Sequence, residues 1–212
     1  MSRGKIILID GISNSGKTTL CNNLSKQLGY KIVPESIRYL ENRLNEKGDN
    51  ILYVPKNIQE ELRNQEILFN LEFDKWFDAN YFADHGQNVV IDKSPYSIVA
   101  TAFAFESSNI SGTYNKSLEF LDDFIEKAKR YKLYSPDLLL LLKADSSASS
   151  KRNLERNHHL LSVWTQESTR QKQEEILEKE FQELDMKKAL IDTSNLSPRD
   201  VYDEALKQIT SL

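Results

Sequence analysis

One stretch near the N-terminus, from Gly11 to Thr18, constrains this chain more than any other, because it matches G-x-x-x-x-G-K-[ST] at every fixed position. Such a loop turns tightly at its glycines and points successive backbone N–H groups at a phosphate, beside the positive end of the following helix. Its lysine bridges the β- and γ-phosphates of a nucleotide, and its hydroxyl residue offers an oxygen to Mg²⁺. The pattern predicts a site for ATP and Mg²⁺, in which Lys17 is catalytic and Thr18 binds the metal. The nucleotide-binding residues of the loop are predicted to be Gly11, Ser13, Asn14, Ser15, Gly16, Lys17, Thr18 and Thr19.

The residues around the loop follow the order that this motif requires. Residues 5–10 form a short, β-branched apolar run, which predicts a buried strand. Beyond the loop, Leu20, Leu24 and Leu28 recur at every fourth position and lie on one face of a predicted helix, and Gly29 stands where that helix would end. The alternative is a glycine-rich turn without a ligand, and the succession of strand, loop and helix argues against it.

Length and composition limit the class of protein. We expect 212 residues to form a single domain, 1–212, with a five-stranded sheet buried between helices. The net charge of −4 provides no positive field for a nucleic-acid polymer. One cysteine excludes an internal disulfide framework, and no run approaches the ~18 apolar residues that span a membrane. We therefore expect a cytoplasmic protein with a small-molecule partner and no membrane contact, and leave a homodimer open.

Glu35 is the first candidate for the acceptor side of the site. It follows a brief predicted strand that ends at Pro34, and ligands of open parallel sheets collect beyond the carboxyl ends of strands. A carboxylate there can accept a hydroxyl proton or anchor a substrate. The alternative is an acid at the start of a helix that begins near Ser36. Arg38, one turn later, either contacts a substrate phosphate or is solvated.

Asp92 ends a second buried strand, predicted over residues 88–92. An aspartate at such a strand end, facing a phosphate-binding loop, can hold Mg²⁺ directly or through water. Lys93 beside it could neutralise phosphoryl charge. The alternative is that Asp92 caps a helix that starts near Pro95.

Between these two acids we expect a mobile loop over residues 41–56, forming part of a substrate lid, and a long helix over residues 57–84. Gln65 lies on that helix. An amide side chain can form paired hydrogen bonds with a base edge, although a helical glutamine is commonly only solvated.

The second half of the chain continues the alternation of strands and helices. The pattern predicts core helices over residues 96–105 and 116–132 and a leucine-rich strand over residues 137–143. Residues 145–165 form a predicted lid in which Arg152 and Arg156 share one helical face and could stabilise a transferring phosphoryl group. The alternative is a solvated charged face. The remaining elements are predicted to be a helix over 166–188, a strand over 188–193 and a helix over 197–209.

Together these residues resemble the nucleoside and nucleotide kinases with a phosphate-binding loop, which include thymidylate kinases and deoxynucleoside kinases. The resemblance covers nearly the whole chain. Besides the loop, it rests on Val33-Pro34-Glu35, Asp92-Lys93-Ser94-Pro95-Tyr96-Ser97, Ser135-Pro136-Asp137 before the leucines, Lys151 to Arg156, and Ile191-Asp192-Thr193-Ser194.

The resemblance implies an α/β fold of three layers with a five-stranded parallel sheet in the order 2-3-1-4-5. It also implies that Glu35 acts on the acceptor hydroxyl and that Arg152 and Arg156 clamp phosphates. Lys93 stands where these families usually carry arginine, whose planar fork a lysine lacks. We assign Glu35, Arg38, Gln65, Lys93 and Tyr96 to the acceptor site.

The function that follows is phosphoryl transfer from ATP to a small acceptor, foremost a nucleoside or a nucleoside monophosphate. A hydroxyl acceptor needs a base, which Glu35 provides, whereas a phosphate acceptor needs extra cations. Two alternatives stay open: a kinase for another metabolite, such as a vitamin, nicotinamide riboside or an antibiotic, and a regulatory nucleotide-dependent switch. A GTPase is disfavoured because the chain lacks an Asn-Lys-x-Asp signature.

Overall fold

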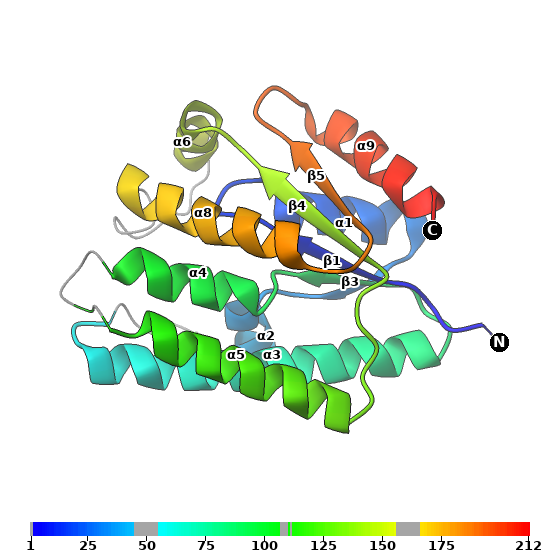
Figure 1. The fold of residues 1–212 in the computed structure, drawn as a ribbon. Coiled ribbons are helices and arrows are strands. Elements are labelled where there is room, and N and C mark those ends of the chain that lie inside the picture. The colour runs from blue at the N-terminus through cyan, green and yellow to red at the C-terminus, as the bar shows by residue number, and fades with distance from the viewer. Residues whose placement is uncertain (1, 45–54, 107–109, 111, 156–165) are drawn as a thin grey trace.

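A computed structural model of the chain describes residues 2–44, 55–106, 110, 112–155 and 166–212. In this part of the chain, five parallel strands form one sheet in the order β2-β3-β1-β4-β5 (Figure 1). The sheet order and the α/β class predicted from the sequence are confirmed. The strands are β1 (Ile6–Asp10), β2 (Lys31–Val33), β3 (Val89–Asp92), β4 (Leu138–Lys143) and β5 (Lys188–Asp192).

Helices cover both faces of the sheet. One face carries α1 and α9, and the other carries α3, α4, α5 and α8, with α2 packed on α3 (Figure 1). The described helices are α1 (Lys17–Leu28), α2 (Ser36–Leu44), α3 (Ile58–Asp84), α4 (Tyr96–Phe105), α5 (Tyr114–Arg130), α6 (Ser146–Glu155), α8 (Glu167–Glu183) and α9 (Pro198–Thr210).

The first four residues of the central strand β1 are all apolar because both faces of the strand are covered. Ile6 and Leu8 contribute to the core under α3, α4 and α8, whereas Ile7 and Ile9 point to the opposite core under α1 and α9. All five residues of the strand are buried. Side chains on both faces of a parallel strand that is covered by helices on both sides are largely apolar, and the polar exception here is Asp10 at the carboxyl end of the strand. The leucine run of β4 is buried in the same way, so its prediction as a strand is confirmed.

The loop predicted over residues 41–56 is helical where it begins. Residues 41–44, predicted to start a mobile loop, belong to α2, and residues 45–54 of that loop lie outside the described residues. The lid predicted over residues 145–165 begins with α6, because Asp145 Oδ1 accepts the backbone N–H of Ala148 at 2.7 Å and so caps this helix.

The sheet brings the predicted site residues to one edge. Ile9 of β1 pairs with Asp92 of β3, and the backbone N–H of Lys93 donates to Ile9 O at 2.9 Å. The loop that follows β1 and the turn that follows β3 therefore lie side by side. None of the described helices has both the length and the apolar character needed to cross a membrane.

Candidate active site

The phosphate-binding loop depends on its two glycines in different ways. Gly11 has a φ of +141°, and a Cβ added to it would lie 2.2 Å from Leu142 O, so a side chain there would collide with β4. Gly16 has a φ of +104°, occupies the N-cap of α1 and leaves that helix without a side-chain cap. The N-terminus of α1 therefore faces the loop with its backbone N–H groups uncovered by a capping side chain, an arrangement that suits an anion.

Lys17 is buried within the curve of this loop. Its ammonium donates to Gly11 O and to Ile12 O, each at 2.8 Å. Burial lowers the pKa of Lys17, and the nearby charge of Lys93 lowers it further. The carbonyl groups of the loop thus hold the Lys17 ammonium at the place where phosphate is expected. These carbonyls are neutral, and a bound polyphosphate would provide the negative counter-charge for the ammonium.

Asp10, which the sequence analysis did not single out, anchors the loop. Its carboxylate accepts the backbone N–H of Gly11 at 2.7 Å, the hydroxyl of Ser97 at 2.7 Å and the hydroxyl of Ser94. The contacts join the end of β1 to the start of α4. The sequence contains a feature that could have identified Asp10, because this residue is an acid at the end of a predicted buried strand, as Asp92 is.

Thr18 and Asp92, the two predicted metal ligands, are in contact. Thr18 Oγ1 donates to Asp92 Oδ2 at 2.8 Å, and Asp92 Oδ1 is buried with no hydrogen-bond partner in the part of the chain that the structure describes. A free carboxylate oxygen beside a hydroxyl fits Mg²⁺, which binds through one or two protein oxygens together with substrate phosphates and water. Asp92 is not a helix cap, since α4 has Pro95 at its N-cap and no side-chain cap.

Glu35 and Lys93 form an ion pair at the same edge, with Nζ and Oε2 3.0 Å apart and each side chain about a third exposed. The charge of Lys93 lowers the pKa of Glu35 to about 2, and the carboxylate raises the pKa of Lys93 in return. Lys93 also has a φ of +67°, which is uncommon for a residue other than glycine. The fold thus holds the pair in place at some conformational cost.

Two predicted acceptor-site residues lie at or near the start of α2: Glu35 just before the helix and Arg38 within it. Glu35 directly precedes this helix, and its backbone carbonyl accepts the N–H of Tyr39, so the position at a helix start and the contact with Lys93 occur together. Arg38 is 59% exposed in its side chain and pairs with Glu41 at 3.3 Å. The structure does not bring Arg38 to the Glu35–Lys93 pair.

Gln65 is fully buried in α3, so the alternative of a solvated glutamine is wrong. Its Nε2 donates to Glu61 Oε1 at 2.9 Å, and its Oε1 has no hydrogen-bond partner among the described residues. Burial raises the pKa of Glu61 to about 7. Tyr96, the first residue of α4, is half-buried against the core, and burial raises its pKa to about 12. Contacts of Gln65 and Tyr96 with an acceptor stay predictions.

Arg152 lies on α6 and reaches across to the phosphate-binding loop. Its guanidinium donates to Asn14 O at 3.1 Å, to Thr193 Oγ1 at 2.9 Å and to Thr193 O. Thr193 Oγ1 is in turn 3.0 Å from Ser15 O. Arg152 is therefore not a solvated residue, and it connects α6, the loop and the end of β5. Arg156 lies outside the described residues.

A cavity of about 600 Å³ opens next to these contacts, and its size suits a nucleotide base with its sugar. It lies between the start of α1, α6 and the turn from β5 to α9. The lining residues are Ser15, Gly16, Thr19, Leu20, Ala148, Lys151, Arg152, Glu155, Thr193, Ser194, Asn195, Leu196, Ser197, Pro198 and Val201.

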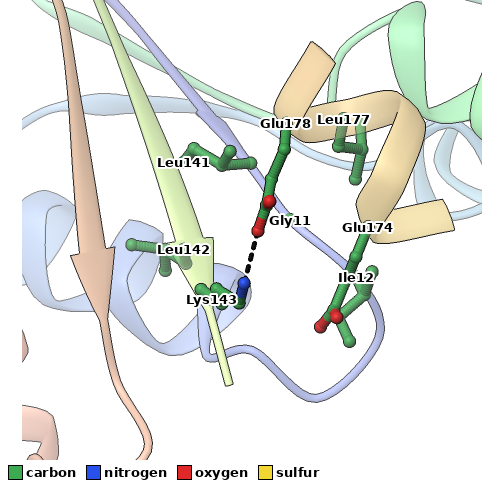
Figure 2. A pocket seen from close by; sticks show the side chains of 8 residues that line it. All are labelled: Gly11, Ile12, Leu141, Leu142, Lys143, Glu174, Leu177 and Glu178. Carbon is green, nitrogen blue, oxygen red and sulfur yellow. Dashed lines mark hydrogen bonds and ion pairs between the residues drawn. The ribbon is translucent and has the colours of Figure 1, made fainter. Parts of the chain in front are cut away.

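A second hollow flanks the loop on its other side but is too small for a substrate. Figure 2 shows Glu178 of α8 pointing at Lys143 at the end of β4, with Nζ and Oε1 2.5 Å apart, and Glu174 beside Ile12. The space measures about 10 Å³, about the room of a single water molecule. It is a packing gap between α8 and the loop.

A parallel sheet of order 2-3-1-4-5, whose first strand runs into a glycine loop that ends in Lys17 and Thr18, defines a P-loop protein that binds a nucleotide. A family model described as deoxynucleoside kinase matches residues 7–186, and the chain belongs to this family. It is thus an enzyme that transfers a phosphoryl group to a nucleoside or nucleotide, as the sequence predicted.

Solved structures show the same fold. A thymidylate kinase from Candida albicans matches with a TM-score of 0.74 and 19% identity over 100% of this chain and 93% of its own. A deoxyadenosine kinase from M. mycoides with bound dATP matches with a TM-score of 0.70 and 17% identity over 97% of this chain and 99% of its own.

Proposed function

We propose that this protein uses ATP and Mg²⁺ to phosphorylate a free hydroxyl group of a deoxynucleoside. The observation that carries the proposal is the ion pair between Glu35 and Lys93 at the acceptor edge. This edge presents a carboxylate whose charge is matched by one ammonium. A neutral hydroxyl acceptor is compatible with that balance, whereas a phosphomonoester dianion would meet Glu35 without an excess of positive charge.

The donor side follows from the loop. The backbone N–H groups at the start of α1 and the Lys17 ammonium would hold the β- and γ-phosphates of ATP. The 600 Å³ cavity beside Arg152 would receive its base and sugar. Thr18 and Asp92 would hold Mg²⁺, which would neutralise phosphate charge when bound. Arg152, after exchanging its contacts with Asn14 and Thr193, would face the transferring group.

In the transfer step, the acceptor oxygen would form a bond to the γ-phosphorus as the bond from that phosphorus to the bridging oxygen breaks and ADP departs. The hydroxyl proton would pass to the Glu35 carboxylate, which is ionised at neutral pH because its pKa is about 2. Such a weak base accepts a proton late in the transfer, when the hydroxyl has become strongly acidic. Lys93 would hold the carboxylate in position and balance the charge at the γ-phosphate.

The test measures ADP formation with Mg²⁺ and ATP against deoxyadenosine, deoxycytidine, deoxyguanosine, thymidine, their monophosphates and unrelated hydroxyl metabolites. We expect turnover with at least one deoxynucleoside and not with its monophosphate. Glu35→Gln should lower kcat about a hundredfold or more while ATP binding persists. The matched control is Glu126→Gln, an exposed glutamate of α5, which should retain full activity.

Each other result has a distinct meaning. Turnover with monophosphates alone would make the protein a nucleotide kinase and contradict the role of Glu35. Turnover with a different metabolite would reassign the acceptor. Slow hydrolysis of ATP that no acceptor accelerates would favour a nucleotide-dependent switch.

A further inference from the structure

An ion pair is buried in the core directly behind the proposed acceptor edge. Among the described residues, Lys75 of α3 is the largest residue whose side chain is fully buried. Glu72, one turn earlier, is 1% exposed. Lys75 Nζ and Glu72 Oε1 lie 2.7 Å apart. Removing two charges from water is costly, and their mutual attraction repays that cost only with good geometry and further hydrogen bonds. The other contacts of this pair therefore matter.

Those contacts lead to the two segments that carry Glu35 and Lys93. Lys75 Nζ lies 3.1 Å from Asp92 O and 3.5 Å from Lys93 O, at the end of β3. Glu72 Oε1 also accepts the hydroxyl of Ser36, which is buried at the start of α2. Ser36 is the next residue after Glu35. The Glu72–Lys75 pair thus contacts the backbone of Lys93 and the side chain of Ser36, the residue next to Glu35.

The contacts close a ring. From Glu35 the ring passes along the chain to Ser36, across to Glu72 and Lys75, on to the carbonyl of Lys93, and through the Lys93 side chain back to Glu35. Lys93 has a φ of +67°, a conformation that a residue with a side chain adopts only when its surroundings enforce it. The ammonium of Lys75 at the neighbouring carbonyls supplies such enforcement.

We propose that Lys75 and Glu72 are positioning residues for phosphoryl transfer, which set the place of the Glu35 carboxylate and the Lys93 ammonium relative to Asp92. The inference rests on the function proposed above for Glu35. A rigid link of this kind matters because a displacement of about 1 Å at a reacting group can cost roughly a hundredfold in rate. The positive charge of Lys75 also contributes to the low pKa of Glu35.

The competing explanation is that the pair only fastens α3 to the sheet. A purely structural role predicts lower stability with unchanged kcat in whatever protein remains folded. A positioning role predicts a selective loss of kcat, with ATP binding preserved, because the phosphate-binding loop is anchored separately by Asp10.

The principal variant is Glu72→Gln together with Lys75→Met in the full chain. It removes both charges at nearly constant volume, so that no lone charge stays buried. We expect a folded protein whose Kd for ATP, measured by calorimetry, stays within about twofold, and whose kcat with the nucleoside acceptor falls roughly 10- to 100-fold. Ser36→Ala removes one link of the ring and is a milder variant that should fold; we expect a loss of several-fold in kcat.

Ile209→Ala provides the control for loss of stability. Ile209 lies at the end of α9 in the opposite core, in a cluster that includes no member of the ring. This variant should lower the melting temperature and leave kcat unchanged at temperatures where it is folded.

A double-mutant cycle with Glu35→Gln makes the decisive comparison. If the pair acts through Glu35, adding Glu72→Gln and Lys75→Met to Glu35→Gln should reduce kcat by less than twofold further. Wild-type kcat in the folded principal variant would overturn the inference, as would a loss that simply multiplies with that of Glu35→Gln. If the principal variant does not fold, unchanged kcat in Ser36→Ala overturns it. A wild-type protein that phosphorylates no nucleoside would refute the proposed function first, and this inference with it.

Discussion

Thr18 Oγ1 donates a hydrogen bond to Asp92 Oδ2 at 2.8 Å and so joins the first turn of α1 to the end of β3. In the described part of the chain, no group of three or more histidine, cysteine, aspartate or glutamate side chains could hold a metal ion by itself. A Mg²⁺ ion at these two residues would therefore depend on nucleotide phosphates and water for its other ligands.

Asp92→Asn should weaken the use of Mg²⁺ because it replaces a charged ligand with a neutral one. We expect the Mg²⁺ concentration for half-maximal rate to rise about tenfold or more at saturating ATP. The measurement is a Mg²⁺ titration of ADP formation, with Asp123→Asn on the exposed face of α5 as control. An unchanged titration curve would remove Asp92 from the metal site.

Lys17→Ala should abolish phosphoryl transfer and leave the fold intact. The ammonium is buried at a cost that lowers its pKa, and it bonds only loop carbonyls in the described structure, so its removal should change the melting temperature by a few degrees at most. Loss of a phosphate contact of this kind costs roughly 10²–10³ in rate. Thermal unfolding and ADP formation together test this, and full activity would end the phosphate-loop hypothesis.

The ion pair of Glu35 with Lys93 should appear in the titration of Glu35. Carboxyl NMR should give a pKa of about 2 in the wild type and a value nearer the ordinary 4.5 in Lys93→Met. A lowered pKa in the folded state means that the pair stabilises the protein above pH ~4.5 and that this contribution fades as the pH falls towards 2. At this partly exposed site we expect on the order of 1 kcal/mol in urea unfolding at neutral pH. Equal pKa values in both proteins would contradict the contact.

Glu61 should make the free energy of unfolding depend on pH in the opposite sense. Its pKa is raised to about 7 in the folded state, so the folded protein retains a proton that the unfolded chain releases near 4.5. Stability should therefore decrease as the pH rises from about 4.5 to 7 and then level off. Glu61→Gln should remove this slope and raise stability at pH 8 on the order of 2 kcal/mol. Urea unfolding of the wild type and of Glu61→Gln at pH 5 and pH 8 measures the difference. An equal change in the free energy of unfolding between the two pH values in both proteins would exclude Glu61 as the cause.

Gly11→Ala and Gly29→Ala should differ sharply although both glycines have positive φ. Gly29 at the end of α1 has no atom within 4 Å of an added Cβ. An alanine there is therefore disfavoured only by the left-handed backbone conformation, at about 1–2 kcal/mol. Gly11 adds a collision with Leu142 O. We expect several-fold greater destabilisation in Gly11→Ala and loss of ATP binding. Similar melting temperatures for the two variants would show that the loop tolerates a side chain at Gly11.

Much of this protein could be read from its sequence because the deciding interactions are local. The apolar run of β1, the glycine loop and the helix behind it are adjacent in the chain, and their order alone predicts a nucleotide site. Parallel strands place their carboxyl ends at one edge, so two acids, Glu35 beyond β2 and Asp92 at the end of β3, are expected to lie near the loop. The fold class and the kinase family followed from the same features, and both are confirmed.

Side chains on long helices could not be assigned in this way. Gln65, Glu72 and Lys75 lie among many polar residues of α3, and a periodic charged pattern does not distinguish a solvated face from a face packed under the sheet. Arg152 likewise looked free to meet a phosphate, whereas the fold turns it towards Asn14 and Thr193. Residues adjacent in the chain thus specify the chemistry of the loop and the edge of the sheet on which it acts. Which polar groups are buried against that edge was decided only by tertiary packing, because burial and pairing depend on residues far away in the chain.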